Sequence, residues 1–204
     1  MVHGYHVIFG AYGFWLPNDP RGSWSDYVGA WELARFGKTT KSIERTELTP
    51  AEERQRVQAK KALKYPAVQF TGEQARAAGR GFANAVVKSG YTIWACSVLP
   101  EHVHLVIARH TYKAEQMVTL LKGEATKQLI EEDIHPLAAH AKEGEPPPTT
   151  WARGKWIVYL DDEDAIENAI RYVEENPVKE GKPAQHWKFV TAFAGLDAGW
   201  VTYH

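Results

Sequence analysis

Four short runs of the chain combine apolar, β-branched and aromatic residues in a way that is typical of β-strands. They are GYHVIFGAYGFW at 4–15, TIWACSVLP at 92–100, HVHLVIARH at 102–110 and KWIVYL at 155–160. The first run ends at LPNDPRG, a cluster of turn residues, and only Pro100 and Glu101 separate the second run from the third. The pattern predicts four strands, of which the middle two form a hairpin.

Two longer segments between these runs carry apolar residues at helical spacing. The stretch TGEQ at 71–74 is a capping box, so a helix should begin there, run to about Lys88 and stop at Gly90. The second segment covers residues 113–132, and its apolar positions recur as on one face of a helix: Met117, Leu120, Leu121, Ala125 and Leu129. Both helices are expected to pack on the sheet.

A last helix is expected over residues 162–176, ending near Asn176 because Pro177 disfavours helix at the residue before it. The order is then strand, helix, strand, strand, helix, strand, with one further helix appended. This is the split βαβ order of ferredoxin-like folds. We therefore expect an α+β fold: a ferredoxin-like βαββαβ antiparallel sheet, helices on one face, and an added C-terminal helix that carries Tyr172.

Residues 16–70 differ in composition from the rest and are interpreted as an insertion. A loop rich in Gly, Pro, Asn and Asp precedes a charged stretch at 35–64, which holds nine Lys and Arg against four Glu. Within that stretch, a capping box at Thr49 predicts a short exposed helix over 50–64. Its basic face is either a simple solvated surface or a contact for phosphates. The chain as a whole is predicted to be one domain, 1–204.

Charge and composition limit the classes of function. The 24 Lys and Arg nearly balance the 25 Asp and Glu, so any nucleic-acid partner must be met by a local patch rather than by a general basic field. Cys96 is the only cysteine, which fits a reducing compartment. The chain opens without a cationic leader and has no apolar run long enough to cross a membrane, so a cytoplasmic location is expected, nucleoid-associated when bound to DNA.

His102 and His104 lie one residue apart in the third strand-like run. Alternate residues of a strand point to the same face, so both imidazoles share a face with Val106, while Val103, Leu105 and Ile107 form the fully apolar face. The apolar face should lie under the helices and the imidazoles on the less covered side. The pair is close enough to bind one cation, but two histidines in a strand also occur for purely structural reasons.

Tyr172 and Asn176 lie one helical turn apart on the rim of the last helix, beside its buried stripe of Ile166, Ile170 and Val173. A metal on the sheet would meet both together: an amide oxygen as ligand and a phenol as nucleophile. This geometry permits a site of His102, His104 and Asn176. The alternative is that Tyr172 flanks the core and Asn176 merely ends the helix.

The combination resembles the HUH endonucleases, and among them the REP-associated tyrosine transposases. His102-Val103-His104 fits the family's His-hydrophobic-His signature, and Tyr172 followed by NPVK at 176–179 looks like its Tyr-x-x-x-Asn-Pro-Val-Lys/Arg segment. LPEHVHLV at 99–106 and LLKGEATKQL at 120–129 are also similar to the family, so the resemblance spans about residues 91–182 plus the first strand. The histidine pair alone is a weak signal; its specificity comes from the tyrosine segment that follows.

The resemblance implies a metal-dependent, transposase-like single-strand DNA endonuclease that cleaves and rejoins hairpin-forming DNA. Tyr172 would attack the scissile phosphate to give a 5′-phosphotyrosine intermediate and a free 3′-hydroxyl. A phenol with a pKa of about 10 needs a polarised phosphate, and Mg²⁺ or Mn²⁺ held by His102, His104 and Asn176 would provide it. The implied partner is single-stranded or hairpin DNA, bound by a monomer or a homodimer.

Several cationic or aromatic residues near these motifs are candidate DNA contacts. They are Arg21, Trp24, Lys122, Lys127, Arg153 and Lys179. The ordinary alternative is that the lysines are solvated and that the tryptophan packs in the core.

Three rival functions stay open at this point. A catalytically inactive or host-adapted DNA-hairpin-binding protein of the same fold would keep these residues. A structural domain would use His102 and His104 for internal hydrogen bonds. A histidine-triad nucleotide hydrolase would need a third histidine at position 106, where Val106 stands.

Overall fold

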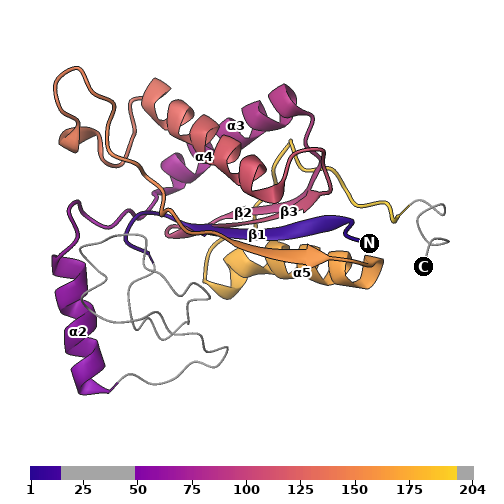
Figure 1. Ribbon diagram of the computed structural model, residues 1–204, viewed down its shortest axis with the longest axis horizontal. Helices are drawn as coiled ribbons and strands as arrows, with labels where there is room; N and C mark the ends of the chain where they lie inside the picture. The colour runs from indigo at the N-terminus through magenta and orange to yellow at the C-terminus, as the bar shows by residue number, and fades with distance from the viewer. Residues whose placement is uncertain (15–48, 197–204) are drawn as a thin grey trace.

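The computed structural model describes residues 1–14 and 49–196, and Figure 1 shows how their elements are arranged. The strands are β1 (Gly4–Gly10), β2 (Ile93–Val98), β3 (His102–Ala108) and β4 (Trp156–Leu160). The helices are α2 (Pro50–Lys61), α3 (Gly72–Ser89), α4 (Ala114–Glu131) and α5 (Glu163–Lys179), with a 3₁₀ turn at Ala138–His140. Apart from that turn, this order is the one predicted from the sequence, with α2 as the helix of the predicted insertion.

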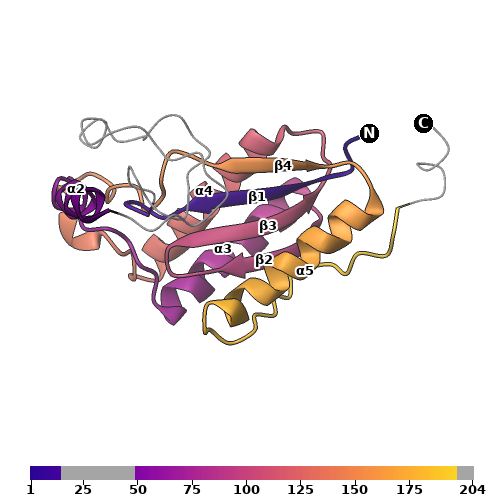
Figure 2. The same ribbon diagram turned by 90° about the horizontal axis from the view of Figure 1, so that it is seen from below.

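The four strands form one antiparallel sheet in the order β2-β3-β1-β4, which is visible in Figure 2. β1 lies between β3 and β4, so strands far apart in the sequence are neighbours in the centre of the sheet. Together with the βαββαβ element order, this confirms the ferredoxin-like prediction. The predicted hairpin is also present, since β2 and β3 pair directly across the turn at Pro100 and Glu101.

The two faces of the sheet bury different sets of residues. On one face, α3 and α4 cover the main core, which includes Val7, Phe9, Phe82, Val103, Leu105, Ile107, Met117 and Leu121. On the other face, α5 covers a smaller cluster of Ala95, Val106, Leu160, Ile166 and Val173. The predicted alternation of β3 is therefore confirmed: its fully apolar side lies under α3 and α4, and the side that carries His102 and His104 lies under α5.

The predicted ends of the first strand and of the last helix are wrong. The first strand ends at Gly10 instead of residue 15, because Tyr12 and Gly13 form a turn in which Gly13 has a φ of +82°, a conformation that favours glycine. The last helix continues through Pro177 to Lys179 instead of ending near Asn176. Pro177 has no N–H to donate to the preceding turn, but the last turn is closed by hydrogen bonds from the Glu180 N–H to the Asn176 carbonyl at 3.1 Å and from the Lys182 N–H to the Pro177 carbonyl at 2.8 Å.

The described part of the predicted insertion contains α2. Thr49 caps it through the expected capping box with Glu52, but the helix stops at Lys61, three residues short of the predicted end, and Pro66 follows soon after. Residues 16–48 of the predicted insertion lie outside the described residues. Among the helices of the described ranges, none is long and apolar enough to cross a membrane.

The chain after α5 turns back along the outer edge of β2. The side chain of Gln185 accepts a hydrogen bond from the Val98 N–H and donates one to the Val98 carbonyl, both at 2.8 Å. Val190 then forms a parallel bridge with Ile93, and the Thr191 N–H donates to the Ile93 carbonyl at 2.8 Å. Backbone groups at the edge of β2 are thus satisfied by a segment that is not a strand.

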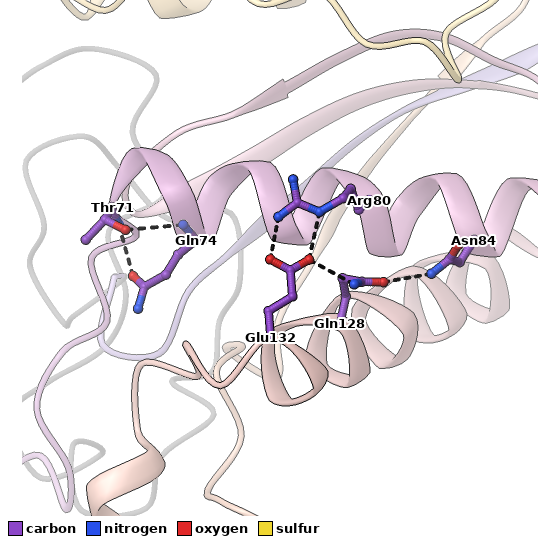
Figure 3. A network of polar contacts seen from close by, with 6 residues as sticks. All are labelled: Thr71, Gln74, Arg80, Asn84, Gln128 and Glu132. Carbon is purple, nitrogen blue, oxygen red and sulfur yellow. Dashed lines mark hydrogen bonds and ion pairs between the residues drawn. The ribbon is translucent and has the colours of Figure 1, made fainter.

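Helices α3 and α4 approach each other closely and are joined by polar contacts (Figure 3). Arg80 forms a two-pronged ion pair with Glu132, with Nε 2.7 Å from Oε1, and Gln128 links Glu132 to Asn84 by two hydrogen bonds of 2.9 Å. A Cβ added at Gly81 would lie 2.4 Å from the Ala125 Cα, so the two backbones meet at this glycine. Glycine is therefore required at position 81 by the packing of the two helices.

We expect Gly81→Ala to lower the free energy of unfolding by about 1–3 kcal/mol, although alanine favours helix over glycine. The added methyl group meets backbone atoms of α4, so the helices must separate. Urea denaturation measures the change, and Gly123→Ala is the matched control because a Cβ there meets nothing within 4 Å. The control should gain up to about 1 kcal/mol; equal effects at both positions would contradict the close approach.

Candidate active site

The two histidines of β3 lie on the sheet face that α5 covers, and both are buried, His102 at 8% and His104 at 4% exposure. Their ring centroids are 4.9 Å apart. The ring of Phe14 stacks on His102 at 4.7 Å with an interplanar angle of 16°. The two imidazoles are thus held in one place by the strand below and by aromatic packing beside them.

Helix α5 brings Tyr172 to these histidines. The Tyr172 ring centroid is 5.6 Å from that of His104, and the side chain remains 46% exposed. The Lys179 Nζ lies 5.5 Å from the Tyr172 ring centroid and is paired with Glu175 at 2.7 Å. A phenol that is both exposed and next to the histidine pair can be reached by a substrate that touches the pair as well.

A third histidine, which the sequence reasoning did not assign, completes this cluster. His6 on β1 has its Nε2 atom 3.1 Å from Nδ1 of His104, and its ring centroid is 5.7 Å from that of Tyr172. The signal was the alternation in GYHVIFG, where Val7 and Phe9 belong to the main core and His6 therefore points to the opposite face. Placing it beside His104 required the pairing of β1 with β3, which puts His6 opposite Val106.

Asn176 and Glu180 follow Tyr172 at successive helical turns. Asn176 is buried at 7% exposure, and among the described residues its Nδ2 atom finds no hydrogen-bond partner. Glu180 Oε1 lies 3.7 Å from Nε2 of His102. Residues four apart share one side of a helix. Asn176 therefore lies between Tyr172, which is near His104, and Glu180, which is near His102. Glu180 was not predicted, since the helix was expected to end before it.

Burial decides the charge of the imidazoles. Burial lowers the pKa of His6 to about 4. It also holds the pKa of His104 well below its usual range, with the neighbouring His102 and His6 adding to the effect. Both rings are therefore neutral at pH 7, and a neutral imidazole keeps one nitrogen lone pair for a cation or a hydrogen bond.

A divalent cation would have to use a mixed set of ligands here. Within residues 1–14 and 49–196, no three side chains of His, Cys, Asp or Glu are arranged as a metal site. The imidazoles of His102 and His104 offer nitrogen ligands, and the buried amide of Asn176 offers an oxygen. This set fits a cation that accepts both nitrogen and oxygen ligands and also binds further oxygens from a substrate.

The candidate DNA contacts lie in different surroundings. Arg153 is exposed, Lys127 is paired with Glu124 at 2.7 Å, and Lys179 lies beside Tyr172, as described above. Arg21 and Trp24 lie outside the described residues. Their roles as DNA contacts stay predictions.

Lys122 is more enclosed than its helical position suggested. Its Nζ donates to the carbonyls of Ala152 at 2.8 Å and Gly154 at 3.3 Å, and it lies 5.0 Å from the ring centroid of Phe9. Burial, with a smaller contribution from Lys155, lowers its pKa to about 8. The side chain thus ties α4 to the loop that enters β4, and any contact with a phosphate has to come from its remaining hydrogen.

Lys122 should make the free energy of unfolding depend on pH in the alkaline range. The pKa of an unfolded lysine is about 10.4, so between about pH 8 and pH 10 the unfolded chain binds more protons here than the folded chain does. The cost of burying the charge is present below pH 8 and is relieved as the pH rises. Relative to Lys122→Met, the free energy of unfolding should rise by on the order of 2 kcal/mol over this range. A difference that does not change with pH in urea titrations would contradict the buried charge.

The chain is similar to a known protein family and to solved structures of two transposases. The sequence model of the family described as "Transposase IS200 like" matches residues 61–176. A REP-associated tyrosine transposase solved bound to a REP hairpin aligns with a TM-score of 0.46 and 13% identity, over 89% of this chain and 70% of that one. A crystal structure from Deinococcus radiodurans R1, also described as a transposase, aligns with a TM-score of 0.40 and 12% identity, over 90% and 94% of the two chains. Among curated proteins, none matches.

The family match covers β2, β3 and α4 and extends through α5 as far as Asn176. It therefore includes both histidines of β3 and Tyr172. The match extends over more than half of the sequence, and this chain belongs to the IS200-like transposase family.

Proposed function

We propose that this protein is a metal-dependent single-strand DNA endonuclease and strand-transfer enzyme that acts through Tyr172 on hairpin-forming DNA. The observation that carries the proposal is the position of Tyr172: exposed, on a helix laid across the sheet, with its ring 5.6 Å from that of His104. Membership of a transposase family supports a reaction in which DNA strands are cut and rejoined. The resemblance of the histidine and tyrosine motifs to REP-associated tyrosine transposases supports the hairpin substrate.

In the proposed reaction, the Tyr172 Oη attacks the scissile phosphorus. The bond from Oη to phosphorus forms and the bond from phosphorus to the 3′-oxygen breaks, which leaves a 5′-phosphotyrosine and a free 3′-hydroxyl. The half-exposed phenol loses its proton to solvent, and solvent protonates the departing 3′-oxygen. Attack by a 3′-hydroxyl on the phosphotyrosine reverses these steps and rejoins a strand.

His102, His104 and Asn176 are proposed to hold Mg²⁺ or Mn²⁺, which supplies Lewis-acid polarisation of the phosphate and neutralises its charge. The neutral imidazole of His104 suits this role, since a protonated ring has no lone pair to offer. Lys179, whose Nζ lies beside the Tyr172 ring, is proposed to contact the same phosphate. The proposed substrate is single-stranded DNA, because a phosphate bound between the sheet and α5 must approach without a paired strand beside it.

The test is incubation with hairpin-bearing single strands and Mg²⁺ or Mn²⁺, followed by denaturing gels. The substrate is labelled at its 3′ end in one arm and at its 5′ end in the other. The proposal predicts a covalent adduct that carries the 3′ label only, a released 5′-labelled fragment, and a modified peptide that contains Tyr172. Hairpin binding without an adduct across a broad hairpin library would overturn the activity and favour a catalytically inactive hairpin-binding protein.

A further inference from the structure

We propose that His6 is a positioning residue for His104: it accepts a hydrogen bond from Nδ1 of His104 and so keeps Nε2 of that ring free and oriented for the cation. The inference rests on the proposed function for its purpose, but the contact itself does not. Nε2 of His6 and Nδ1 of His104 are 3.1 Å apart and come from different strands of the sheet.

The chemistry of a neutral imidazole pair leaves two possibilities. Each ring has one N–H and one bare nitrogen, so at this contact one ring donates and the other accepts. If His6 donates, His104 carries its own hydrogen on Nε2 and has no lone pair left for a cation. If His104 donates from Nδ1, its Nε2 is bare and can act as ligand. Only the second arrangement is compatible with a metal at His104.

The surroundings of His6 favour a positioning role over a direct ligand role. Its Nε2 is already used by His104, and the described residues contain no group of three His, Cys, Asp or Glu side chains that could hold a metal ion. Its ring lies between β3 and α5, with its centroid 5.4 Å from that of His104 and 5.7 Å from that of Tyr172. Groups that hydrogen-bond to the second nitrogen of a metal-bound histidine commonly fix its tautomer and orientation.

The same position links the ligand to the nucleophile. The centroids of the His6 and His104 rings are almost equally far from that of Tyr172, at 5.7 and 5.6 Å. A rotation of the His104 ring about its χ2 angle would break the contact with His6, and this torsion is otherwise soft for an aromatic side chain. His6 therefore holds the ring that faces the cation in a fixed relation to the phenol that faces the phosphate.

The experiment compares His6→Leu with His6→Gln. Leucine fills part of the space but offers no hydrogen bond, whereas the amide oxygen of glutamine can accept from Nδ1 of His104. Two measurements that need no DNA are made on each protein. The first is Mn²⁺ affinity from the electron paramagnetic resonance signal of the free ion, and the second is the tautomer of His104 from long-range ¹H–¹⁵N spectra, assigned with His104→Gln.

We expect the native protein without metal to carry the His104 hydrogen on Nδ1. His6→Leu should shift the tautomer toward Nε2–H and weaken Mn²⁺ binding by about 10–100-fold, whereas His6→Gln should recover most of both. A native His104 with its hydrogen on Nε2, or leucine and glutamine variants that bind Mn²⁺ as tightly as the native protein, would overturn the inference. Thermal unfolding of the three proteins separates these outcomes from a loss of folding.

The same samples distinguish this inference from the proposed function. If the tautomer and Mn²⁺ results are as expected but the native protein forms no DNA adduct, the role of His6 stands and the transesterase activity fails. If the native protein forms the adduct and both His6 variants form it equally well with unchanged Mn²⁺ affinity, the activity stands and the role of His6 fails.

Discussion

Replacement of Tyr172 by phenylalanine is expected to abolish the DNA adduct and to lower strand cleavage by about 10³-fold or more, because the only atom removed is the nucleophile. Phenylalanine keeps the ring that lies near His6, His104 and Lys179, so the packing of α5 on the sheet is retained. The hydroxyl belongs to a half-exposed side chain, so its loss should leave the melting temperature nearly unchanged.

The matched control is Tyr159→Phe. Tyr159 is 58% exposed, lies on β4 and packs edge-on against Tyr5 of β1. Tyr5 is on the same face of β1 as Val7 and Phe9, which belong to the core under α3 and α4. It is therefore an exposed tyrosine on the wrong face of the sheet for this chemistry, and its substitution should leave cleavage intact. Adduct formation by Tyr172→Phe at the native rate would show that another residue is the nucleophile.

Removal of the first imidazole should separate cleavage from DNA binding. We expect His102→Ala to reduce cleavage in Mg²⁺ or Mn²⁺ by about 100-fold or more, because it removes a proposed metal ligand and not only a residue that orients a ligand. Affinity for hairpin DNA, measured by fluorescence anisotropy at one fixed salt concentration, should change little, because most of it comes from contacts with phosphates elsewhere. Unchanged cleavage would refute the proposed metal site.

His102 also packs in the structure, so this variant needs a check of its folding. The ring is buried and stacked on Phe14, and alanine leaves a cavity there. If His102→Ala unfolds below the assay temperature, His102→Gln preserves more of the volume and removes the imidazole. His186→Ala, at an exposed position in the segment after α5, is the control and should cleave normally.

Much of this architecture could be predicted from the local pattern, because periodicity determines which side of an element is buried. The alternation in HVHLVIA placed His102 and His104 opposite the main core, and the structure confirms that placement. The helical spacing of Tyr172 and Asn176 put them on one side of α5, and Tyr172 does meet His104. These predictions needed no knowledge of which elements are neighbours.

The parts of the site that were missed depend on contacts between elements. His6 becomes part of the site only when β1 pairs with β3, and a single sequence does not give that register. Glu180 was missed because Pro177 was expected to end the helix, whereas the helix continues through it to Lys179. The enclosure of Lys122 was not predicted, because a helical pattern does not give the loop that folds back to meet the side chain.

The contact between Gln185 and Val98 has a consequence for the order in which the protein can be completed during synthesis. β2 is made long before residues 185–191 leave the ribosome, so for that interval its outer backbone groups have no partner from this segment. An open strand edge is a template for pairing with other chains. The nascent protein therefore passes through a period in which this edge is open, and the finished molecule closes it with the Gln185 amide and the backbone of residues 190–191.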